Sequence, residues 1–149
     1  MSFEERGAWS GMVSGVLAFF IWGRPIWTGT VTGAFDGPDG LARWAIQVIW
    51  LIGGGVLLAI AVLVLFNIGY AILTRQPKPQ FIIDERDTRI SHRGALVSLI
   101  VVNCAILIAI ILLALGLSAL AALNTILVGM AVAAVASEML RIVVYRLGT

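Results

Sequence analysis

Charged residues and catalytic motifs are scarce in this sequence. Only 12% of its 149 residues are Asp, Glu, Lys or Arg, and 60% are apolar, whereas soluble proteins carry about 25% charged residues. The mean hydropathy of +1.03 argues against a soluble globular domain. The sequence contains no Walker A, HExxH, GxSxG, CxxC or Rossmann glycine pattern. Because its polar loops are also too short for a soluble catalytic domain, we expect a protein that is not an enzyme and has no cofactor.

Cysteine and histidine are equally rare. The one cysteine, Cys104, lies in an apolar run, where an internal disulfide is impossible and a small buried hydrophobe is the usual role. A metal site built from Asp84, Asp87 and His92 is the least favoured alternative because these ligands lack a recognised spacing, so we predict no metal site.

The chain has a pI near 9.2, but its basic residues flank apolar runs. That placement predicts orientation in a membrane and no binding of nucleic acid.

Four apolar stretches are long enough to cross a bilayer, which takes about 20 residues. We predict spans over about 9–30, 41–73, 95–115 and 119–144. The expected fold is an all-α, polytopic integral membrane four-helix bundle, forming a single transmembrane domain over residues 1–149. A short cytoplasmic juxtamembrane helix is expected just before the third span.

The loop at 75–93 holds eight of the chain's 18 charged residues. Together with the two termini it carries eight Lys or Arg, against two on the opposite side. The positive-inside rule therefore predicts a multi-pass protein with a cytoplasmic loop, N-terminus and C-terminus.

Within this loop, Pro77 and Pro79 exclude a helix at the start, and Asp84 has the character of a helix N-cap. The acids come first and the bases later, as the helix dipole favours. The favoured interpretation is a solvated helix that touches anionic lipid headgroups. The alternative is a partner-binding site made of Asp84, Glu85, Arg86, Asp87, Arg89 and Ile90.

Two further features lie in the spans. Glu138 is an acid within a span, and Arg141 follows three residues later, so an interface-level ion pair is favoured over proton or ion handling. Small residues recur on the fourth span and, more weakly, on the first, which favours close helix packing within the bundle over an interface with another subunit. The predicted packing residues are Gly11, Gly15, Thr125, Gly129, Ala133 and Ser137.

Three sequence segments, SFEERGAW, IDERDTRI and SEMLRIVVYRLG, together resemble the DUF2178-like family of small prokaryotic four-span membrane proteins. The matching positions are Asp84, Glu85, Arg86, Asp87 and Ile90, and then Arg141, Ile142, Tyr145, Arg146 and Gly148. The resemblance implies a bacterial inner (plasma) membrane protein of a family without an established activity.

These observations predict a non-enzymatic accessory or regulatory subunit that binds a membrane or cytosolic partner. The expected partners are a bilayer with anionic headgroups and another protein subunit or further copies of the chain. The alternative is a small transporter or ion-conducting oligomer that uses Glu138.

Overall fold

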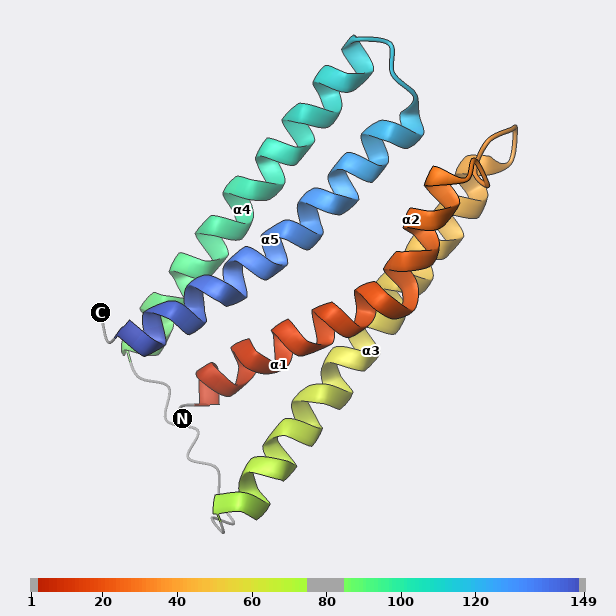
Figure 1. Cartoon of the computed structure of the whole chain (residues 1–149). Helices are drawn as coiled ribbons and strands as arrows, with labels where there is room; N and C mark the ends of the chain where they lie inside the picture. Colours follow the sequence, from red (N-terminus) through yellow and green to blue (C-terminus); the bar gives the residue numbers. More distant parts are fainter. Residues whose placement is uncertain (1–2, 75–84, 148–149) are drawn as a thin grey trace. The chain divides into compact units, whose positions relative to one another are not determined.

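The computed structural model describes residues 3–74 and 85–147, and every secondary-structure element in these ranges is a helix (Figure 1). The elements in chain order are α1 (Phe3–Ala18), the π-helical turn η1 (Phe19–Gly23), α2 (Arg24–Val31), α3 (Gly40–Thr74), α4 (Glu85–Ala114) and α5 (Ala119–Leu147). The chain divides into two compact units, Met1–Trp9 with Pro79–Thr149, and Ser10–Lys78.

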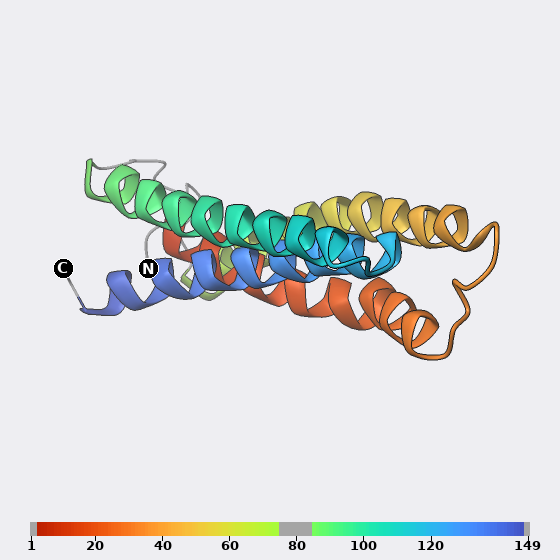
Figure 2. The ribbon, with the colours of Figure 1, turned by 90° about the horizontal axis from the view of Figure 1, so that it is seen from above.

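Helices α4 and α5 form an antiparallel hairpin and lie side by side in both views (Figures 1 and 2). The turn between them begins with a Schellman motif, in which Leu117 N–H donates to Leu112 O and Gly116 N–H donates to Leu113 O, both at 3.0 Å. Gly116 takes a φ of +79°, which glycine adopts without a steric penalty. Ser118 then caps α5, because its hydroxyl accepts the Ala121 N–H at 3.2 Å. The predicted break at 116–118 therefore coincides with the observed turn.

Small side chains allow α4 and α5 to approach closely. Ala105 and Ala109 on α4 are buried, as are Gly129 and Ala133 on α5. A Cβ added to Gly129 would overlap the Cβ of Ala105, so only glycine fits at this crossing. Without water to drive apolar surfaces together inside a bilayer, such close van der Waals packing is a main source of helix association.

The first half of the chain begins with one long helical run from Phe3 to Val31, interrupted by η1. In this turn the Arg24 N–H donates to Phe19 O, five residues back, instead of four. Pro25 follows immediately at the start of α2. Proline has no N–H and its ring collides with the carbonyl four residues earlier, so a widened turn relieves the clash.

Helix α3 returns after a loop that contains Gly33 and Gly37 in the left-handed region, with φ of +73° and +96°. A glycine of α3, Gly54, contacts Trp22 in the helical run Phe3–Val31. A Cβ on Gly54 would lie 2.8 Å from Trp22 Cε2, so the indole ring occupies the space that a side chain would fill.

Three helical segments are long and apolar enough to cross a membrane: Gly40–Leu73, Asp87–Ala114 and Ala119–Leu147. They correspond to the second, third and fourth predicted spans. The first predicted span, 9–30, falls in the run from Phe3 to Val31, which η1 divides into helices of 16 and 8 residues. A fourth membrane crossing therefore stays a prediction. The expected juxtamembrane helix is not a separate element, because α4 runs without interruption from Glu85 to Ala114.

Candidate functional site

The candidate site lies at the open end of the α4–α5 hairpin, where α4 begins and α5 ends. The first turns of α4 sort their residues onto two faces. Asp87 and Ile90 are buried, with 8% and 3% of their surfaces exposed. Glu85 and Arg89, four residues apart, are exposed. Two of the four described members of the predicted partner-binding motif therefore face into the protein. Asp84 and the side chain of Arg86 lie outside the described part of the chain.

Asp87 is held by a residue from the far end of the sequence. The Tyr145 hydroxyl donates to Asp87 Oδ1 at 2.9 Å, although the two residues are 58 positions apart. A hydrogen bond to a carboxylate is stronger than one between neutral groups. The bond therefore fixes the rotation of α4 against α5 and joins two of the three sequence segments that carry the family resemblance. We name it the Asp87–Tyr145 clasp.

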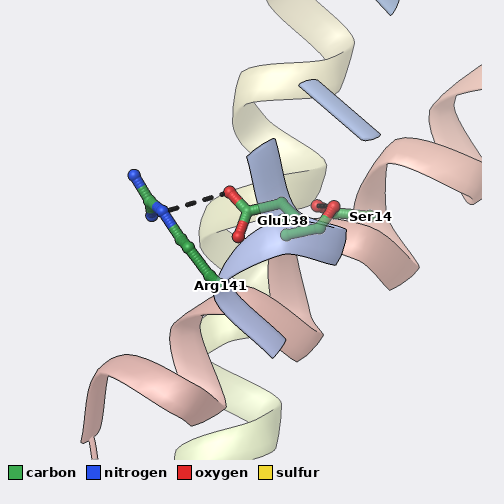
Figure 3. Close-up of polar contacts among 4 residues, drawn as sticks. Ser14, Glu138 and Arg141 are labelled. Carbon is green, nitrogen blue, oxygen red and sulfur yellow. Dashed lines mark hydrogen bonds and ion pairs between the residues drawn. The ribbon is translucent and has the colours of Figure 1, made fainter. Parts of the chain in front are cut away.

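The predicted ion pair lies on α5 near the clasp. Arg141 Nη1 is 3.7 Å from Glu138 Oε1, and the two side chains are 24% and 22% exposed (Figure 3). The stem of Arg141 packs against α4 at Gly94, where an added Cβ would lie 2.7 Å from Arg141 Nε and 2.9 Å from Ser137 Oγ. Gly94 therefore leaves room for the arginine between the two helices.

The beginning of α1 joins the same end of the hairpin. The guanidinium carbon of Arg146 lies 5.8 Å from the centroid of the Trp9 ring, within the range of a cation–π contact. Arg6 and Ala8, three residues and one residue before Trp9, are buried with 5% and 0% of their surfaces exposed. The N-terminal segment thus belongs to this end of the hairpin. Composition alone gave no indication of its contact with α5.

The predicted packing residues divide between the two units. On α5, Gly129, Ala133 and Ser137 are buried, and Gly129 packs against α4. Thr125 bonds its own helix, donating to Ala121 O at 2.9 Å. On α1, Gly11 O accepts a hydrogen bond from the Ser14 hydroxyl at 3.0 Å. A Cβ on Gly15 would meet nothing within 4 Å.

Ligands for a metal ion do not gather in the described residues. Within 3–74 and 85–147, no group of three or more His, Cys, Asp and Glu side chains is placed to hold an ion. Of the three residues considered as ligands, Asp87 bonds Tyr145 and His92 is exposed. Asp84 is outside these ranges.

Sequence reasoning singled out Asp87 and Tyr145 without pairing them. Asp87 and Tyr145 stood in separate motifs, and the only signal that could have joined them was that both motifs adjoin predicted cytoplasmic helix ends. Comparison with protein-family models, with curated proteins and with solved structures finds no match. The DUF2178-like resemblance therefore stays a prediction.

Proposed function

We propose that the chain is a small multi-pass membrane protein of the bacterial inner membrane. Its role is that of a non-enzymatic accessory or regulatory subunit, with both termini and the 75–93 segment in the cytoplasm. It binds a protein partner through the exposed face of the first turns of α4. The observation that carries the proposal is the sorting of charge there, since Asp87 is engaged inside the protein while Glu85 and Arg89 face outward.

The outward residues lie on one side of α4, and we call them the charged strip: Glu85, Arg89, His92 and Arg93, all exposed. Their spacing of four, three and one places them along one helical face. The Asp87–Tyr145 clasp opposes rotation of α4, which would turn this strip inward. A fixed pattern of one acid followed by bases favours a partner surface with the complementary order of charges.

The small residues of α5 contribute less to this proposal than the sequence suggested. Gly129 packs against Ala105 of the same chain, so this part of the small-residue stripe is already occupied. The charged strip, by contrast, is exposed to solvent.

Anionic headgroups are the other ligand suited to the strip, because each basic residue near such a surface contributes about 1 kcal/mol. Glu85 distinguishes the two interpretations. A carboxylate opposes a lipid phosphate, whereas it favours a protein partner that presents a base. Binding that weakens on Glu85→Gln therefore supports a protein partner, and binding that strengthens supports lipid alone.

Affinity purification in mild detergent tests the proposal. The wild-type chain should enrich a partner protein, and Arg89→Gln should reduce the amount recovered. Arg24→Gln serves as the matched control, since Arg24 is also exposed but lies on the predicted opposite side of the membrane. Recovery of the chain alone, with no enriched protein, would contradict the proposal.

Labelling of introduced cysteines tests the topology. In a Cys104→Ala background, cysteines placed within 36–40 and within 76–80 should react from opposite sides of the membrane. Labelling from the same side would refute the four-span arrangement.

Glu138 supports a second candidate function, a small transporter or ion-conducting oligomer. This acid lies in the apolar segment Ala119–Leu147 with a side chain only 22% exposed. Intramembrane carboxylates mark proton and ion pathways in other proteins. The candidate predicts that Glu138→Gln abolishes an ion flux in proteoliposomes, and it fails if the wild type shows no flux.

A further inference from the structure

Helix α4 has a second exposed surface, on the side opposite α5. It is a line of residues spaced alternately four and three apart, which we name the outer stripe: Leu96, Ile100, Asn103, Leu107 and Ile110. The four apolar members are 58%, 61%, 59% and 57% exposed, in that order, and Asn103 is exposed as well. By contrast, Ala105 and Ala109 on the face toward α5 are 7% and 3% exposed.

Asn103 is the residue that an ordinary lipid-facing surface would not contain. It stands 11 residues from the end of α4 at Ala114, or about 16 Å at 1.5 Å per residue. In a hydrocarbon core about 30 Å thick, that depth is close to the middle. The side chain donates one hydrogen bond, from Nδ2 to Leu99 O at 2.8 Å. A primary amide has two N–H donors and an oxygen with two lone pairs, so this bond uses only part of its capacity.

The hydrogen-bonding groups of the Asn103 amide that are left over indicate which partner fits there. A primary amide is self-complementary, because its oxygen accepts what its own N–H groups donate. Two copies of one chain inserted in the same direction hold their α4 helices parallel and at equal depth. A twofold axis along the membrane normal then brings each Asn103 opposite its counterpart.

We propose that a second copy of this chain packs α4 against α4 along the outer stripe, with the two Asn103 amides hydrogen-bonded across the axis. Contact residues spaced alternately four and three apart are typical of helix pairs that wind around each other with a left-handed twist. One Asn among such contact residues fixes how the helices align and how many of them associate. Leucine and isoleucine supply the surrounding contacts. The inference rests on the proposed membrane placement.

Disulfide cross-linking in native membranes tests the geometry. In a Cys104→Ala background, Leu107→Cys places a thiol on the outer stripe, where packed helices bring paired Cα atoms within the roughly 4.4–6.8 Å that a disulfide needs. Ile108→Cys is the matched control, because Ile108 is 50% exposed but lies roughly 100° further round the helix. We expect oxidation to give a covalent dimer with Leu107→Cys and little with Ile108→Cys. Equal yields, or none from Leu107→Cys, would overturn the proposal.

Co-purification of two differently tagged copies tests the role of the amide. Asn103→Leu should raise the dissociation constant of the dimer roughly 3- to 20-fold, as expected for one hydrogen bond between membrane helices. Asn103→Gln keeps the amide and should retain most of the association. An unchanged constant in Asn103→Leu would refute the amide pairing.

Extraction of membranes with alkali separates this inference from the proposed function. A chain that stays in the membrane pellet but does not dimerise refutes the outer-stripe dimer alone. A chain released by alkali refutes the membrane placement, and the dimer with it.

Discussion

The Asp87–Tyr145 clasp gives the sharpest energetic prediction. Tyr145→Phe removes only the hydroxyl oxygen that lies 2.9 Å from Asp87 Oδ1. Asp87 is 8% exposed, so water has limited access to replace the lost donor. Hydrogen bonds to charged groups contribute about 1.5–3 kcal/mol to stability. We therefore expect Tyr145→Phe to lower the free energy of unfolding by about 2 kcal/mol.

Two further variants isolate the contact. Asp87→Asn keeps an oxygen that accepts from the tyrosine but removes its charge, so the expected loss is smaller, about 1 kcal/mol. Glu85→Ala removes an exposed acid from the same turn of the helix and should change stability by less than about 0.5 kcal/mol. The order of the three losses, with Tyr145→Phe largest, follows from the geometry.

Equilibrium unfolding in mixed detergent micelles measures these free energies. A double-mutant cycle with Tyr145→Phe and Asp87→Ala should give a coupling of about 1–3 kcal/mol, as for residues in direct contact. Additive losses, within about 0.5 kcal/mol, would show that the clasp contributes nothing and would refute the argument that it fixes the rotation of α4.

Two other contacts lead to predictions of the same kind. Gly129→Val forces a side chain into the space of Ala105 and should destabilise the hairpin by about 1–3 kcal/mol in the same unfolding assay. Gly15→Ala should not, because nothing lies within 4 Å of its added Cβ; equal losses would contradict the close-packing argument. Arg146→Gln removes the cation above Trp9 and should cost about 0.5–1 kcal/mol, whereas Arg146→Lys should keep most of the contact. A loss in Arg146→Lys as large as that in Arg146→Gln would contradict the cation–π interpretation.

Local chemistry made much of the fold predictable. The turn at 116–118 follows from one glycine and one capping serine, and the helices on either side end within a few residues of the predicted limits. The first span was harder to predict. The effect of Pro25 on the preceding turn depends on how the backbone relieves the clash, and a π-helical turn is one of several outcomes.

The candidate site was predictable only in part. The chemistry of Glu138 and Arg141 indicated an ion pair, and the structure places their charged atoms 3.7 Å apart on neighbouring turns. The sequence places Asp87 with Glu85 in the partner-binding motif, because a one-dimensional pattern shows charge and not direction. The structure instead turns Asp87 inward to Tyr145 and leaves Glu85 outside.

By itself, the sequence determined where the long apolar helices lie and where the hairpin turns, since hydrophobic length and turn chemistry are properties of neighbouring residues. Tertiary structure alone decided which side of each helix meets another helix. A helix that is apolar on all sides carries little amphipathic signal for its own rotation. That rotation is set by contacts between distant residues, the Asp87–Tyr145 clasp and the fit of Gly129 against Ala105. The same contacts leave the charged strip and Asn103 facing outward.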